Sequence, residues 1–100
     1  MNNLLLKDKY CLITGATSGI GKSAALKMSN MGANITFIAR NPDKAKSLVE
    51  EITKASDKKP RAIIADLSSQ REVRRASEEY LRLDQPLHIL LNNAGIVNIN

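Results

Sequence analysis

The chain has 100 residues, enough for one domain with a single hydrophobic core, and its 43% hydrophobic and 25% charged residues are ordinary for a soluble globular protein. Its net charge of +5 comes from 15 lysines and arginines spread along the sequence, which favours solvated helix faces over a nucleic-acid-binding surface. No apolar run approaches the length of about 20 residues that a membrane span needs.

The single cysteine, Cys11, excludes an internal disulfide and fits a reducing compartment. It lies in an apolar stretch, where we expect a small buried side chain rather than a reactive thiol. The first seven residues are too few and too polar for a signal peptide, so we expect a cytoplasmic protein. No Cys/His cluster indicates a metal site.

The first predicted element is a short buried strand over residues 10–13, followed by a glycine-rich turn over residues 14–21. After the turn, apolar residues recur at spacings of three and four and predict one face of a helix: Ile20, Ala24, Ala25, Met28 and Met31. Such a turn directs free N–H groups and the positive end of the helix dipole at one spot, which suits a pyrophosphate. The alternative is a glycine turn that binds nothing.

The three glycines of this turn are expected to have different structural roles. Gly15 can adopt the backbone angles of a tight turn, Gly19 lets the chain approach a ligand, and Gly21 lets the helix pack close to its strand. Their G-x-x-x-G-x-G spacing is neither G-x-G-x-x-G nor a P-loop, because five residues, not four, separate Gly15 from the Gly21-Lys22 pair.

Two strands and one helix are predicted next. Gly32 ends the first helix, and the β-branched and aromatic residues of 34–39 predict the second strand. Asn41-Pro42-Asp43 begins the second helix with a capping side chain, a proline and an acid. The apolar face of that helix is Ala45, Leu48, Val49 and Ile52. After a polar loop, residues 61–65 form the third strand.

A third helix and a fourth strand complete the pattern. Residues 69–72 have the form of a capping box and open the helix. Its apolar side is Val73, Ala76, Tyr80 and Leu83, and its charged residues of both signs predict a solvated face. Residues 88–92 form the fourth strand. His88, the only histidine, stands at the entry of that strand, where a structural role is favoured over a catalytic one.

Strands alternating with helices indicate an α/β fold with a parallel sheet. Right-handed crossovers give the strand order 3-2-1-4, a partial doubly wound Rossmann sheet, with the first two helices on one face and the third on the other. Chain order reverses between the first and fourth strands. Open α/β sheets bind their ligands at such a switch point, and the glycine turn lies there.

Arg40 ends the second strand, the place where an acid binds the 2′-hydroxyl of NAD and an arginine accommodates the 2′-phosphate of NADP. Its planar guanidinium matches phosphate geometry, so the sequence favours NADP over NAD. A solvated arginine at a strand end is the alternative. Asp66 follows the third strand. The residues alone explain it as the start of the turn into the third helix, a position that Asp favours.

Two motifs, the T-G-x-x-x-G-I-G of residues 14–21 and Asn92-Asn93-Ala94-Gly95, with Asp66-Leu67 between them, resemble the short-chain dehydrogenase/reductase family. Residues 86–95 resemble its retinol-dehydrogenase-like branch. The resemblance implies that Asp66 accepts a hydrogen bond from the adenine amino group beside the Leu67 backbone, and that Asn92 braces the sheet. Its implied cofactor contacts are Gly15, Thr17, Ser18, Gly19, Ile20, Gly21, Arg40, Asp66, Leu67, Asn93, Ala94 and Gly95.

The resemblance implies that residues 1–100 are the NADP(H)-binding N-terminal portion of an oxidoreductase, incomplete after the fourth strand. The family's chemistry uses a Ser and a Tyr-x-x-x-Lys pair, whereas Tyr10 and Tyr80 are followed four positions on by Thr14 and Asp84. No catalytic residue is assigned, and the chain is expected to be inactive alone. The alternatives are a nucleotide-binding module, alone or with a complementing C-terminal chain, and a non-functional truncated remnant. We also expect marginal stability or self-association.

Overall fold

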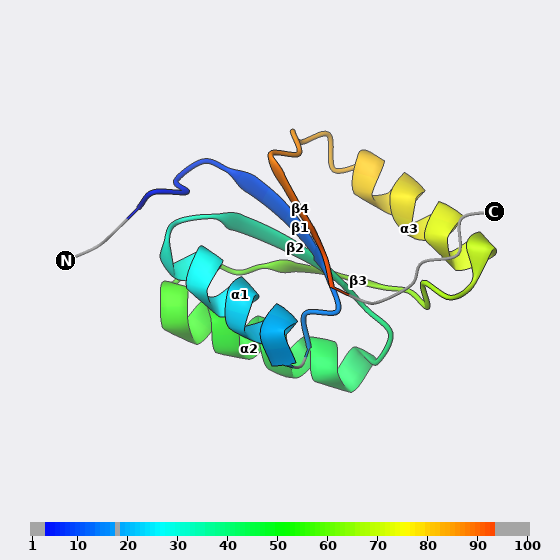
Figure 1. Cartoon of the computed structure of the whole chain (residues 1–100), viewed down its shortest axis with the longest axis horizontal. Helices are drawn as coiled ribbons and strands as arrows, with labels where there is room; N and C mark the ends of the chain where they lie inside the picture. Colours follow the sequence, from blue (N-terminus) through cyan, green and yellow to red (C-terminus); the bar gives the residue numbers. More distant parts are fainter. Residues whose placement is uncertain (1–3, 18, 94–100) are drawn as a thin grey trace.

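The computed structural model describes residues 4–17 and 19–93 and confirms the α/β architecture (Figure 1). Four parallel strands form one sheet in the order β3-β2-β1-β4, as predicted. The elements are β1 (Tyr10–Thr14), α1 (Gly19–Asn30), β2 (Asn34–Ala39), α2 (Pro42–Ser56), β3 (Arg61–Ile64), α3 (Gln70–Leu81) and β4 (Ile89–Asn92). In the register of the sheet, Leu12 of β1 pairs with Thr36 of β2 and Leu90 of β4.

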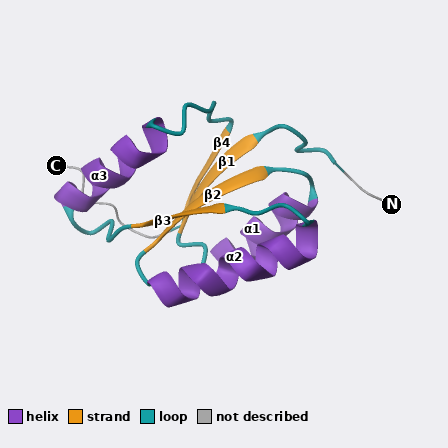
Figure 2. Ribbon diagram, turned by 180° about the vertical axis from the view of Figure 1, so that it is seen from behind, coloured by secondary structure: helices purple, strands orange, loops and turns teal. Residues whose placement is uncertain are grey.

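The helices form two layers, with α1 and α2 on one face of the sheet and α3 on the other (Figures 1 and 2). Because successive strand residues point to opposite faces, the core divides in two. Cys11, Ile13, Phe37, Leu48 and Ile52 are among the buried residues on the α1–α2 side. Ile38, Ile63, Ala65, Ala76 and Tyr80 are buried on the α3 side. As expected, Cys11 is a buried free thiol, and burial raises its pKa.

Local capping explains where two helices begin and end. The Asn41 side-chain oxygen accepts the N–H groups of Asp43 at 2.9 Å and Lys44 at 3.1 Å, so it caps α2 as predicted. At the end of α1, Gly32 has φ +96°. The N–H of Gly32 donates to the Ser29 carbonyl and that of Ala33 to the Met28 carbonyl, which is a Schellman motif.

The predicted apolar face of α1 is partly wrong. The buried residues of this helix are Gly21, Ala25 and Ser29, a stripe four residues apart, whereas Ile20 is 79% exposed. Ile20 lies in the first turn, beyond the covered area of the sheet, and faces a hollow instead of the core. The α1 layer is therefore built from small residues, which let the helix lie close to its strand.

The predicted capping box of α3 is half formed. Ser69 accepts the N–H of Glu72 at 3.3 Å, but the Glu72 carboxylate does not return to Ser69. The Ser69 N–H donates instead to the Asp66 carbonyl, and Glu72 accepts the N–H of Asp66. Four predicted boundaries also differ: β1 ends at Thr14, β3 ends at Ile64, α3 ends at Leu81 before Leu83, and β4 begins at Ile89.

Strand β4 is an edge of the sheet in the described part of the chain. Its Leu90 pairs with Leu12 of β1, which contacts the core on the α3 side, yet Leu90 itself is 59% exposed. At the amino end of β4, His88 has the structural role expected of it, since its Nδ1 accepts the N–H of Tyr10 at 2.9 Å. None of the described helices combines the length and hydrophobicity of a membrane-crossing segment.

Candidate functional site

A hollow of about 710 Å³ lies at the carboxyl ends of the strands, where parallel sheets bind their ligands. We call it the crevice. It is lined by the glycine turn after β1, the ends of β2 and β3, the loop that leads into α3, and the residue after β4. Its lining residues are Gly15, Thr17, Gly19, Ile20, Ile38, Ala39, Arg40, Ala65, Asp66, Leu67, Ser68 and Asn93.

The glycine turn has the geometry that its spacing predicts. Gly15 and Gly19 have φ values of +64° and +57°, in the region that side chains with a Cβ disfavour. A Cβ on Gly21 would stand 2.1 Å from the Gly15 carbonyl oxygen and 2.8 Å from Asn93 Nδ2. Position 21 therefore accepts only glycine without a shift of the backbone, and α1 starts directly behind the turn.

Thr14 joins the two motifs across the sheet. Its hydroxyl donates to Asn92 Oδ1 at 2.7 Å and accepts the backbone N–H of Asn93 at 2.9 Å. Because Thr14 ends β1 and Asn92 ends β4, these bonds hold the two strand ends together beside the switch point. Asn92 thus braces the sheet, as the resemblance implied, and Asn93 reaches the crevice.

Two opposite charges line the crevice. Arg40 follows β2 and is exposed, and Asp66 follows β3. Hydrogen bonds from the Ser68 hydroxyl and the Ser68 N–H lower the pKa of Asp66, and the charge of Arg40 lowers it further. Asp66 is therefore an ionised acceptor at neutral pH, and Arg40 is a cation available to an anion.

The structure brings most of the predicted cofactor residues together. Eight of them line the crevice: Gly15, Thr17, Gly19, Ile20, Arg40, Asp66, Leu67 and Asn93. Gly21 packs behind the turn instead, and Ser18, Ala94 and Gly95 lie outside the described residues. Sequence reasoning missed Ile38, Ala39, Ala65 and Ser68 as lining residues. The signal for Ser68 is its place two residues after an aspartate, where its N–H and hydroxyl can meet the carboxylate.

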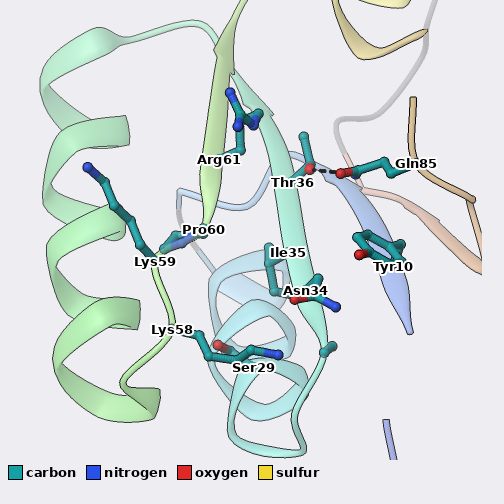
Figure 3. Close-up of a pocket in the computed structure, with 11 residues that line it drawn as sticks. Tyr10, Ser29, Asn34, Ile35, Thr36, Lys58, Lys59, Pro60, Arg61 and Gln85 are labelled. Atoms are coloured by element: carbon teal, nitrogen blue, oxygen red, sulfur yellow. Dashed lines mark hydrogen bonds between the residues drawn. The ribbon is translucent and has the colours of Figure 1, made fainter. Parts of the chain in front are cut away.

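A second hollow, of about 290 Å³, lies at the opposite ends of β1, β2 and β3 (Figure 3). It contains Lys58 and Arg61, and Gln85 donates to the Thr36 hydroxyl at its rim. Helices α1 and α2 end beside it, and helix C-termini carry partial negative charge. Lys58 Nζ donates to the Gly32 carbonyl at 2.9 Å, so this basic side chain satisfies a backbone carbonyl just after the end of α1.

No group of three or more potential metal-ligating side chains occurs among residues 4–17 and 19–93.

The charged face of α3 is solvated, as predicted. Arg75 pairs with Glu72 and Glu79, and Arg82 lies 3.9 Å from Glu78.

The amino-acid sequence matches one protein family over most of its length. The family profile described as short chain dehydrogenase matches residues 9–100. Human retinol dehydrogenase 12 is 38% identical over 98 residues, which cover 95% of this chain and 30% of that protein. A 3-oxoacyl-acyl-carrier-protein reductase of Aquifex aeolicus is 34% identical over 91 residues, covering 91% of this chain and 37% of that protein. The chain thus spans about a third of the length of these relatives.

Solved structures share the fold. A short chain dehydrogenase of Shigella flexneri, solved in complex with NADP, superposes with a TM-score of 0.84 at 28% identity. The aligned region covers 96% of this chain and 41% of the Shigella protein. The RhlG/NADP complex of Pseudomonas aeruginosa gives a TM-score of 0.83 at 30% identity, covering 95% of this chain and 38% of its own.

Proposed function

Because the chain belongs to the short chain dehydrogenase family, we propose that its crevice binds NADP(H). The observation that carries the proposal is the placement of Arg40 at the carboxyl end of β2, on the rim of the crevice that the glycine turn also lines. A guanidinium at this position matches a 2′-phosphate, whereas NAD sites place a carboxylate there. The NADP complexes of the Shigella flexneri and Pseudomonas aeruginosa proteins support the same choice of cofactor.

The adenosine half of the cofactor has suitable residues in the crevice. The glycine turn and the start of α1 offer N–H groups and the positive helix end to the pyrophosphate. Arg40 would hold the 2′-phosphate, and the Asp66 carboxylate would accept the adenine amino group beside Leu67. Asn93, which lines the crevice, would lie beside the ribose. The family resemblance implies the same for Ala94 and Gly95, which lie outside the described residues. These residues account for the adenosine half of a dinucleotide.

The parent activity that we propose is hydride transfer between NADP(H) and a carbonyl or alcohol. NADP(H) supplies the hydride chemistry, and this chain contributes binding and orientation. The tyrosines of the chain, Tyr10 and Tyr80, lack a lysine four residues on, so no proton-transfer group is assigned to them. We propose that the 100 residues act as the cofactor-binding portion and are inactive alone, in the reducing cytoplasm that the free Cys11 fits.

A second candidate is a nucleotide-binding module that works with a separate chain. The observation that favours it is the edge position of β4 among the described strands, where Leu90 is exposed. An edge strand with an apolar face is a ready pairing site. In that case a complementing polypeptide would add to β4 and supply the groups that react with the substrate.

Calorimetric titration of the chain with NADPH and NADH tests the proposed function. We expect NADPH to bind at least tenfold more tightly than NADH, a difference of about 1.4 kcal/mol. Arg40→Asp should remove that preference. Arg74→Asp, at an exposed position of α3 away from the crevice, is the matched control and should keep it. Equal affinities in the unmodified chain, or no binding, would refute the proposal.

A further inference from the structure

The carboxylate of Asp66 is held in one orientation by the residue two positions further on. Asp66 Oδ1 accepts the N–H of Ser68 at 3.0 Å and the Ser68 hydroxyl at 2.7 Å. In the part of the chain that the structure describes, Oδ2 makes no hydrogen bond. One oxygen is therefore fully engaged, and the other is free for a ligand in the crevice.

The backbone that carries this carboxylate is also fixed. The Asp66 carbonyl accepts the N–H of Ser69 at 3.1 Å, and the Asp66 N–H donates to Glu72 Oε1 at 3.4 Å. Glu72 is held in turn by Arg75, whose Nε lies 3.0 Å from Oε2 and whose Nη2 lies 2.9 Å from Oε1. Arg75 also donates to the carbonyl of Ile64, the last residue of β3.

Glu72 and Arg75 of α3 thus hold the loop after β3, while Ser68 fixes the Asp66 side chain. We propose that Ser68 is a positioning residue that makes the site select a 6-aminopurine dinucleotide over its 6-oxopurine counterpart. The inference rests on the proposed function, since it assumes that the purine lies beside Asp66. With Oδ1 taken by Ser68, Oδ2 can accept an exocyclic amino group. A carboxylate has no proton to donate to a 6-oxo group and repels it.

The same geometry makes a prediction for the isosteric amide. In Asp66→Asn, the two donors of Ser68 still require an acceptor, so they hold the amide oxygen and turn the amide nitrogen toward the base. The site then presents a donor, and its preference should change to the 6-oxopurine. Without Ser68 the amide can turn over, and the inversion should disappear.

The experiment compares the Kd of NADPH with that of its hypoxanthine analogue by calorimetry. We expect the chain to prefer NADPH at least tenfold, Ser68→Ala to reduce this ratio at least threefold, and Ser68→Thr to restore it. Ser77→Ala is the matched control, because Ser77 is an exposed residue of α3 and its hydroxyl donates to the Val73 carbonyl of the same helix. Asp66→Asn should invert the ratio, and Asp66→Asn with Ser68→Ala should bring it near one. The Asp66→Asn result tests the inference even if Ser68→Ala does not fold.

The outcomes separate this inference from the proposed function. If the chain binds NADPH but does not distinguish the two bases, the inference is wrong and the proposed function stands. An unchanged ratio in Ser68→Ala, equal to that of Ser77→Ala, has the same meaning. If neither dinucleotide binds, the proposed function fails and this inference with it.

Discussion

Gly21 lies so close to Gly15 that a Cβ at position 21 would stand 2.1 Å from the Gly15 carbonyl oxygen. Gly21→Ala must therefore push α1 away from the turn. Overpacking of this kind costs about 1–3 kcal/mol, so we expect a loss of unfolding free energy in that range. Displacement of the turn should also weaken NADPH binding at least tenfold. Urea unfolding and calorimetry measure the two effects. Ser23→Ala, at an exposed position of the same helix, should change neither.

Thr14→Val removes a hydroxyl that bonds to the Asn92 side chain and to the Asn93 backbone N–H. Because Thr14 is 6% exposed, its partners lose their bonds in a poorly solvated place, and each unsatisfied group costs about 1–3 kcal/mol. We expect a lower unfolding midpoint and weaker NADPH binding together. Thr53→Val, which removes a hydroxyl that bonds within α2, should lower stability less and leave binding intact. Equal effects of the two substitutions would contradict this role of Thr14.

Asn41→Ala removes the cap of α2 and leaves the N–H groups of Asp43 and Lys44 without their acceptor. Loss of such a cap typically costs about 0.5–2 kcal/mol. Chemical denaturation should show this decrease. Asn30→Ala, at the exposed last residue of α1, provides the comparison and is expected to change stability by less than the cap substitution.

Glu72 makes stability depend on pH in acid solution. Hydrogen bonds from Arg75, and then from the Asp66 N–H, hold its pKa below the ordinary value of 4.5. A lowered pKa in the folded state contributes stability that is present above that ordinary value and is lost as pH falls through the folded pKa. The unfolding free energy should therefore fall more steeply below about pH 4.5 in the unmodified chain than in Glu72→Gln. Glu50→Gln, an exposed change on α2, should keep the steep fall.

Leu90 presents an apolar side chain on the edge strand β4, and we expect the chain to self-associate through this edge. Sedimentation velocity should show a mass that rises with concentration. Leu90→Lys should shift the chain toward monomer, because a lysine on an edge strand opposes pairing. Leu81→Lys, at the exposed last residue of α3, should leave association unchanged. A monomeric chain with a cooperative unfolding transition at high temperature would disprove the expectation.

Periodicity, capping residues and glycine spacing predicted most of this fold because each acts over a few neighbouring residues. Asn41 caps α2 whatever surrounds it, and Gly32 ends α1 in the same local way. The strand order also followed, since crossover handedness leaves few arrangements for alternating strands and helices. The local signals agree with the global topology, and that agreement made the prediction work.

The errors arise where a tertiary contact replaces a local one. Ile20 continues the apolar spacing of α1, yet its position in the first turn places it at the crevice, where the sheet no longer covers it. Glu72 has the spacing of a capping box, but the loop brings the Asp66 N–H and Arg75 to its carboxylate. Ser68 was missed because its role depends on the orientation of the Asp66 side chain, which spacing alone does not determine.

The bond between Thr14 and Asn92 joins residues 78 positions apart, and this separation has a consequence for folding. Contacts between distant residues form late, because closing a long loop costs entropy before any contact forms. The glycine turn and its helix can form early, but the corner beside Asn93 is complete only when β4 docks against β1. A polypeptide emerging from the ribosome would therefore gain this corner of its nucleotide site only after β4 has joined the three strands that precede it in the sequence.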